Sequence, residues 1–283
     1  MTTTTPAGHD HSDEPHAHDG GLLVDLPKLI DRRRALALLG GAGLAVLAGC
    51  AANTGSPASA TSSSAAAGTR GAAGVDVAGI PEETAGPYPG DGSNGPNVLT
   101  ESGIVRSDIR SSFGTSTTTA EGVPLTIRLT LVEADGDTPV EGAAVYLWHC
   151  NRAGEYSMYS NDIADENYLR GVQASDAAGL VTFTSIFPAA YAGRWPHVHF
   201  EVYTSLDEAT AAGQVLATSQ IALPEGACAT VYATSGYEQS VRNLAQSSLT
   251  RDNVFADDGG VSQLATMTGD VAGGYTAALT VGL

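Results

Sequence analysis

The chain has 283 residues, with 13 basic side chains against 31 acidic ones and a formal net charge of −18 at pH 7. A surface this acidic repels phosphate backbones, and no basic stripe interrupts it, so we exclude nucleic acid as a partner. Without its low-complexity parts, the length corresponds to one ordinary domain.

The first 50 residues have the pattern of an export signal. Arg32, Arg33 and Arg34 precede an apolar run (35–48) that is too short to span a bilayer and has the length of a signal-peptide core. The run ends in LAGC, which resembles the lipobox of bacterial lipoproteins, and the paired arginines resemble a twin-arginine signal. We therefore expect an exported lipoprotein, at the cell surface or in the periplasm, that contacts the membrane only through lipid on Cys50.

Residues 51–75 are rich in Ser, Ala and Gly, a composition that predicts a flexible linker. In the remaining domain (76–283), apolar and polar residues alternate as they do in half-buried β-strands. Short strands between Gly, Pro and Asp turns predict an all-β fold, an antiparallel sandwich with little helix. We predict strands at 124–134, 143–150, 180–186, 197–204, 214–223 and 275–283, and helices at 207–213 and 237–249.

Two cysteines, Cys150 and Cys228, remain once Cys50 carries the lipid. An even number in an oxidising compartment favours a disulfide over a pair of buried thiols. We therefore expect a bridge between them.

Two histidines lie on one face of the predicted strand 197–204. Successive strand side chains point to opposite faces, so His197 and His199 share a face and can reach one metal ion. The alternative is that the two histidines are an incidental pair on the protein surface, without a role in metal binding. Tyr191 lies six residues before His197, and Arg194 lies three residues before it. A tyrosine and an arginine so near the histidine pair favour the interpretation as a metal site.

A second informative segment is GAAVYLWHCNRAGEYS, residues 142–157, in which a strand runs into a turn and Tyr156 follows. Alone this pattern is weak, because Tyr is a common strand residue. His149 is a rival histidine, but it lies on the other face of its strand from the predicted metal side. We expect it to be packed or to face substrate rather than to bind metal.

Together the segments resemble the intradiol ring-cleavage dioxygenases, which include protocatechuate 3,4-dioxygenase, catechol 1,2-dioxygenase and exported relatives. The resemblance covers about residues 81–224. It implies a transthyretin-like sandwich with long active-site loops, and an enzyme that uses O2 to cleave a small aromatic diol between its hydroxyl-bearing carbons. The motifs that carry it are, in order, TAGPY, RSDI, GVPLTIRLTL, GAAVYLWHCNRAGEYS and YLRGVQASDAAGLVTFTSIFPAAYAGRWPHVHF.

The resemblance also implies the cofactor, Fe(3+), and the residues of the site. Arg194 matches an arginine that contacts substrate, Gln220 matches an active-site glutamine, and Tyr191 matches the tyrosine ligand that leaves when substrate binds. A phenol ionises on a ferric ion because the metal is the largest local charge, and the metal acts as a Lewis acid. The implied metal ligands are Tyr156, Tyr191, His197 and His199.

The sequence departs from the family pattern in the loop before the histidines. The loop from Tyr191 to His197 is shorter than in the cytoplasmic enzymes, Ala192 replaces a usual proline, and Trp195-Pro196 replaces a usual Pro-x pair. These changes affect the walls of the substrate pocket rather than the metal ligands, so the sequence does not identify the substituents on the aromatic ring of the substrate. The sequence also leaves the oligomeric state open.

Two other interpretations stay open at this point. One is an Fe(II) oxygenase of the extradiol or cupin type, with Glu201 completing a two-histidine, one-carboxylate set. It would leave both tyrosines unexplained. The other is a transthyretin-like cell-surface binding module without catalysis, in which the histidine pair is incidental.

Overall fold

The structure is a computed structural model that describes residues 79–134 and 138–283. The predicted signal (1–50), the predicted linker (51–75), the lipid site at Cys50 and the start of the predicted domain lie outside these residues, so they stay predictions. None of the helices within the described ranges has the length and apolar character needed to cross a membrane.

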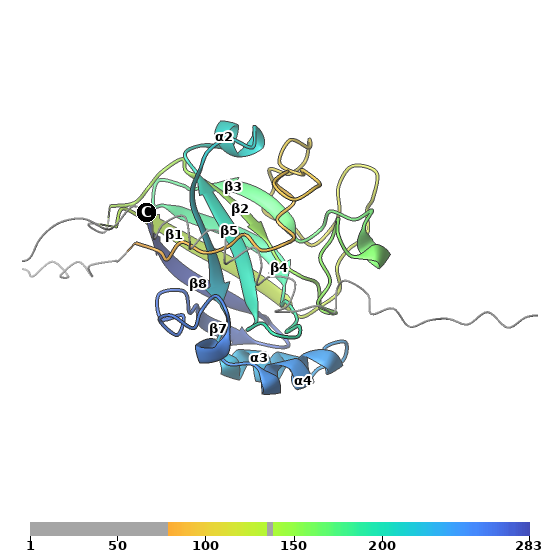
Figure 1. Cartoon of the computed structure of the whole chain (residues 1–283). Coiled ribbons are helices and arrows are strands. Elements are labelled where there is room, and N and C mark those ends of the chain that lie inside the picture. Colours follow the sequence, from red (N-terminus) through yellow and green to blue (C-terminus); the bar gives the residue numbers. More distant parts are fainter. Residues whose placement is uncertain (1–78, 135–137) are drawn as a thin grey trace, which may run out of the picture.

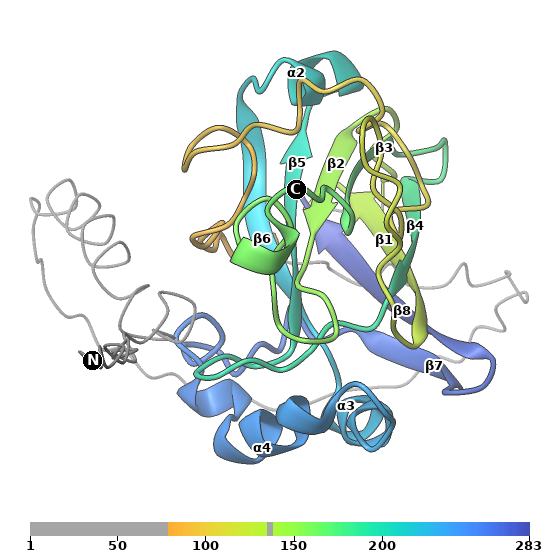
Figure 2. The ribbon, with the colours of Figure 1, turned by 90° about the vertical axis from the view of Figure 1, so that its right-hand side faces the viewer.

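Within residues 79–134 and 138–283, eight strands form two four-stranded sheets, with the orders β4-β1-β8-β7 and β3-β2-β5-β6 (Figures 1 and 2). The helices α3 and α4 lie together at one end of the sheets, and α2 lies at the other (Figure 1). The strands are β1 Pro124–Val132, β2 Ala144–Trp148, β3 Arg170–Ala174, β4 Leu180–Ile186, β5 His197–Tyr203, β6 Val215–Ala222, β7 Thr266–Asp270 and β8 Gly274–Gly282. The helices are α2 Leu206–Thr210, α3 Glu225–Tyr232 and α4 Glu238–Gln246, with 3-10 turns at Asn161–Ile163 and Leu249–Arg251.

The two sheets pack against each other through one apolar core. Alternate residues of β1, among them Ile127 and Leu129, are buried with Val198 and Phe200 of β5 in the same cluster. Every residue of β5 is buried, because a second cluster, which includes Tyr146, Trp148 and Tyr156, covers the opposite face of its sheet. The histidines of β5 therefore belong to a covered outer face rather than to an exposed one.

The expected all-β architecture with few helices is confirmed, but the sheets are not wholly antiparallel. Strands β1 and β8 pair in parallel, with Leu125 opposite Tyr275, whereas every other strand pair is antiparallel. Most of the domain separates these two strands along the chain. Such a long connection allows the parallel pairing that a hairpin forbids.

All six predicted strands are present, and both predicted helices correspond to α2 and α4. The prediction missed β3, β7 and α3. Strand β7 (TMTGD) is largely exposed and shows no apolar alternation, and α3 (EGACATVY) has no clear apolar stripe. These elements exist because of tertiary packing rather than local pattern.

The predicted disulfide is wrong, since Cys150 and Cys228 are free and buried. Cys150 Sγ lies 3.7 Å from the carbonyl oxygen of Ala189, and Cys228 Sγ lies 3.9 Å from that of Leu223. Each thiol thus has its own backbone acceptor within a different apolar cluster. Burial raises the pKa of both thiols to about 12, so they stay protonated and pack as small apolar side chains.

Candidate metal centre

The four residues predicted as ligands meet on the outer face of the second sheet. His197 and His199 are the first and third residues of β5, so both point away from the core that Val198 and Phe200 fill. Tyr156 reaches them from the β2–β3 connection. Tyr191 comes from the β4–β5 connection and is partly exposed, whereas the other three side chains are at most 3% exposed.

Their donor atoms form a closed ring. Tyr156 Oη lies 3.4 Å from Tyr191 Oη, which lies 3.1 Å from His197 Nε2. His199 Nε2 closes the ring, at 3.1 Å from His197 Nε2 and 3.2 Å from Tyr156 Oη. Two oxygen or imidazole ligands about 2.0–2.2 Å from one transition-metal ion, at an angle of about 90–110° to each other, lie about 2.8–3.6 Å apart. The spacing of the ring therefore fits four ligands of a single metal ion.

His197 presents a lone pair to this ring. His197 Nδ1 lies 2.5 Å from the Trp195 carbonyl oxygen, which can only accept, so Nδ1 carries the proton and Nε2 is free to bind a metal. The ring of His199 stacks on Trp148, with 5.0 Å between centroids. Burial, together with the nearby Arg194, holds the pKa of both histidines well below its usual value, so both are neutral.

Tyr156 lies in the same water-excluded surroundings. Burial, and after it the neighbouring Tyr191, raises the pKa of Tyr156 well above its usual value of 10.0. An ionised phenol at this position therefore requires a strong local positive charge. A ferric ion at the centre of the ring would supply that charge, and the donor set of two phenols and two imidazoles fits it.

Arg194 lies beside the ring and is itself buried. Its Nη2 donates to Gln220 Oε1 over 2.6 Å, and its Nη1 lies 3.4 Å from His197 Nε2. Gln220 is directly opposite His199 in the pairing of β5 with β6, and its Nε2 donates to the Thr84 carbonyl oxygen over 2.9 Å. The structure thus brings all six predicted site residues together.

Sequence reasoning missed Asp252, whose side chain is fully buried and forms an ion pair with Arg194, with 3.0 Å between Oδ2 and Nε. The residue lies in the segment TRDNVF, which follows α4 and contains no motif that indicates a functional site. Its distance from Arg194 along the chain hid the contact, and no local pattern could have revealed it.

The N-terminal segment around TAGPY covers the ring of donors. The Tyr88 ring packs on Tyr156 with 5.1 Å between centroids. Gly86 has φ 74°, and a Cβ there would lie 3.2 Å from His199 Cε1, so only glycine allows this close approach. Buried Arg170 anchors the segment by donating to the carbonyl oxygens of Tyr88 and Pro89 over 3.0 and 2.7 Å.

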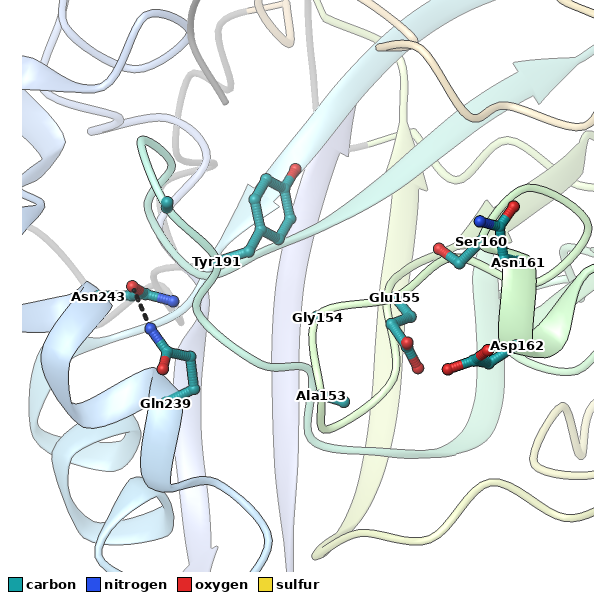
Figure 3. Close-up of a pocket in the computed structure, with 10 residues that line it drawn as sticks. Ala153, Gly154, Glu155, Ser160, Asn161, Asp162, Tyr191, Gln239 and Asn243 are labelled. Carbon is teal, nitrogen blue, oxygen red and sulfur yellow. Dashed lines mark hydrogen bonds between the residues drawn. The ribbon is translucent and has the colours of Figure 1, made fainter. Parts of the chain in front are cut away.

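A cavity of about 610 Å³ has Tyr191 in its wall (Figure 3). Tyr191 belongs to both the cavity and the ring of donors, since it lines the cavity and its hydroxyl contacts His197. Gly154 has φ 90°, and a Cβ there would lie 3.2 Å from Tyr191 Cβ. The cavity is lined by Ala153, Gly154, Glu155, Ser160, Asn161, Asp162, Tyr191, Ala192, Gln239 and Asn243.

Two residues considered from the sequence take no part in the ring. His149 Nε2 lies 2.6 Å from Ser185 Oγ and its Nδ1 lies 2.8 Å from the Cys150 carbonyl oxygen, so it is packed, one of the two roles expected for it. The Glu201 carboxylate accepts from the Tyr203 hydroxyl over 2.7 Å, and burial raises the pKa of Glu201 to about 7. Among the residues described, no group of three His, Cys, Asp or Glu could hold a metal, so the two-histidine, one-carboxylate interpretation has no support.

Comparison with known proteins points to one family. The family model described as Dioxygenase matches residues 94–202, which contain the four ring residues and Arg194, while Gln220 and Asp252 lie beyond it. Chlorocatechol 1,2-dioxygenase of Rhodococcus opacus is 37% identical over 54 residues, and the matched stretch spans only 21% of that relative's length and 19% of this chain.

Solved structures extend the likeness to a larger share of the chain. An intradiol ring-cleavage dioxygenase from Tetranychus urticae is 25% identical, with a TM-score of 0.56 over 72% of this chain and 94% of that one. A second dioxygenase structure has the same identity and coverage and a TM-score of 0.55. Residues 94–202 thus match the dioxygenase family model, and the structures that this chain resembles include intradiol ring-cleavage dioxygenases.

Proposed function

We propose that the protein is a non-haem ferric dioxygenase that cleaves catechol-type rings between their two hydroxyl-bearing carbons. Both atoms of O2 would enter the product, a muconate-type dicarboxylate. The observation that carries this proposal is the closed ring of two phenol oxygens and two imidazole nitrogens, 3.1–3.4 Å apart. We also propose that the two-sheet architecture is of the transthyretin-like type.

Fe(3+) would be held by Tyr156, Tyr191, His197 and His199. It would supply a Lewis acid that binds the catechol oxygens and activates the aromatic ring of the substrate toward O2. The chain provides the rest of the chemistry. Trp148, which stacks on His199, and Tyr88, which packs on Tyr156, keep water from two sides of the ring of donors. The neutral histidines keep their lone pairs for the metal throughout.

Tyr191 is proposed as the replaceable ligand and the base. It lies on the cavity wall between Ala190 and Ala192, with Gly154 next to its Cβ, and these small neighbours would leave its side chain room to turn away when substrate arrives. Its freed phenolate oxygen would take a proton from a substrate hydroxyl. Binding and deprotonation of the substrate would then occur together.

Arg194 is proposed to stabilise the negative charge that develops on the substrate. Its guanidinium is 3% exposed and directs Nη1 toward the ring of donors. A fixed cation in a site without water stabilises such charge far better than a solvated one. Gln220, which holds Nη2, would keep the group in place during turnover.

The test is the purified domain, loaded with iron and supplied with a panel of catechols. We expect O2 uptake in a one-to-one ratio with ring loss, and a product that contains both atoms of labelled O2. A binding module would bind diols without consuming O2. An Fe(II) enzyme would lack the visible absorption of tyrosinate-bound ferric iron and would be active only after reduction. Cleavage next to the hydroxyl pair, rather than between the hydroxyls, would overturn the proposal.

The export of the protein is likewise a proposal, which rests on the LAGC box and the paired arginines of the sequence. Lipid on Cys50 would hold the enzyme at the membrane. We expect Cys50→Ser to move the protein from the membrane fraction to the soluble fraction without loss of turnover. If the variant stays with the membrane as the parent does, the lipid anchor is wrong.

A further inference from the structure

Asp252 uses both of its carboxylate oxygens in buried hydrogen bonds. Oδ2 accepts from Arg194 Nε over 3.0 Å and from the Trp195 backbone N–H over 2.6 Å. Oδ1 accepts from the backbone N–H groups of Val254 and Phe255 over 2.9 and 3.3 Å. One oxygen thus holds the arginine loop, and the other holds the turn that carries the carboxylate, so the carboxylate has little freedom to move.

This contact decides where the guanidinium points. A guanidinium is a rigid planar fork, so two fixed nitrogens determine the direction of the third. Asp252 holds Nε and Gln220 holds Nη2, and Nη1 is thereby directed to His197 Nε2 at 3.4 Å. Without the carboxylate, Nε would lose its acceptor, and the charged end would be oriented by the bond to Gln220 and by the Phe255 ring, 6.0 Å from Cζ.

We propose that Asp252 is the positioning residue for Arg194, acting on the reaction only through that arginine. It lies outside the stretch that matches the dioxygenase family model, in the segment that follows α4. The inference rests on the proposed function for its kinetic test. A purely structural ion pair would stabilise the fold equally well but would leave the turnover of folded protein unchanged.

A double-mutant cycle separates the two roles. We expect Asp252→Asn to lower kcat by about 10-fold or more, with iron content and colour retained, because the positioned donor is lost. In an Arg194→Ala background, the same Asp252→Asn change should alter kcat by less than about 2-fold, since no guanidinium remains to position. Asp257→Asn is the matched control, because it removes an exposed acid from the same segment and should leave kcat unchanged.

A second comparison covers the case in which Asp252→Asn does not fold. Removing both charges of a buried pair is tolerated better than removing one, so the double variant remains usable. Added guanidinium ion should restore turnover of Arg194→Ala by about 10-fold, with Asp252 holding the ion, and should not restore Arg194→Ala/Asp252→Asn. Equal rescue of both variants, or equal effects of Asp252→Asn in both backgrounds, would overturn the proposal.

A readout without turnover keeps the two proposals apart. In the wild-type protein loaded with diamagnetic Ga(3+) in place of paramagnetic iron, the Arg194 Nε–H should give a slowly exchanging NMR signal, because it is buried and bonded to Asp252. Asp252→Asn should abolish that protection while backbone signals of β5 stay in place. If the wild type cleaves no catechol, the proposed function fails, and this signal still tests whether Asp252 fixes the arginine. An unchanged signal in the variant would contradict the positioning role.

Discussion

Tyr156 and Tyr191 contribute the same chemical group to the ring of donors, but their surroundings differ. Tyr156 is 3% exposed, its ring packs on Tyr88, and its backbone N–H donates to Ser160 Oγ over 3.1 Å. Tyr191 is partly exposed and lines a cavity of about 610 Å³. Packing rather than residue type would thus distinguish the proposed ligand that stays from the proposed ligand that leaves.

The largest expected effect is on the packed side of this comparison. Tyr156→Phe should lose most of its iron, since removal of a ligand costs more than the about 10- to 100-fold loss of affinity caused by changes to outer partners. Iron per chain after gel filtration, with thermal unfolding as the control for folding, measures this. Full iron content in a folded variant would mean that Tyr156 is not a ligand.

Arg194→Ala should show the next largest effect, on turnover rather than on iron. The guanidinium touches the ring of donors without belonging to it, so iron and colour should be retained while kcat falls by about 100-fold or more. Iron content and kcat measured on the same sample distinguish the outcomes. Loss of iron with normal turnover per iron would assign Arg194 to folding.

Tyr191→Phe tests the exposed side of the comparison. Iron should stay bound through Tyr156, His197 and His199, with altered colour, and substrate binding should slow by about 100-fold because the base is lost. Stopped-flow absorbance without O2 measures the binding rate. If this variant loses as much iron as Tyr156→Phe, or keeps full activity, the division of roles between the tyrosines is wrong.

The smallest effect is expected from Gly154→Ala, which adds a methyl group next to Tyr191 Cβ. The positive φ should cost about 1–2 kcal/mol of stability, and the new methyl group would press on Tyr191 Cβ from 3.2 Å. Gly142→Ala is the matched control, since Gly142 has φ 80° and a methyl group added there would meet nothing within 4 Å. We expect equal loss of stability by denaturant titration but slower substrate binding only in Gly154→Ala; equal binding rates would show that the contact does not matter.

The parts of the site that lie close together in the chain were predictable. Strand alternation places His197 and His199 on one face, and the loop before them carries Tyr191 and Arg194. Tyr156 could be joined to them only through the family motif, because β3, β4 and the connections around them separate it from β5. Asp252 was beyond reach, since its contact with Arg194 depends on how the segment after α4 folds back on the sheet.

The errors in the predicted fold have the same cause. Alternation revealed the strands with one buried face, but it could not show that β1 and β8 pair in parallel, because pairing partners depend on the whole chain. The count of cysteines suggested a bridge, yet the fold gives Cys150 and Cys228 separate apolar environments. The number of cysteines shows which disulfide pairings are possible, but it does not show whether two cysteines lie close together in the fold.

The most direct test of the central claim, that two tyrosines and two histidines hold ferric iron, is the visible spectrum of the iron-loaded wild-type domain beside both tyrosine variants. A tyrosinate bound to ferric iron absorbs visible light. We predict an intense band in the wild type that changes when catechol is added without O2, a weaker and shifted band in Tyr191→Phe, and little iron or colour in Tyr156→Phe. A colourless wild type that contains a full complement of iron would contradict the claim.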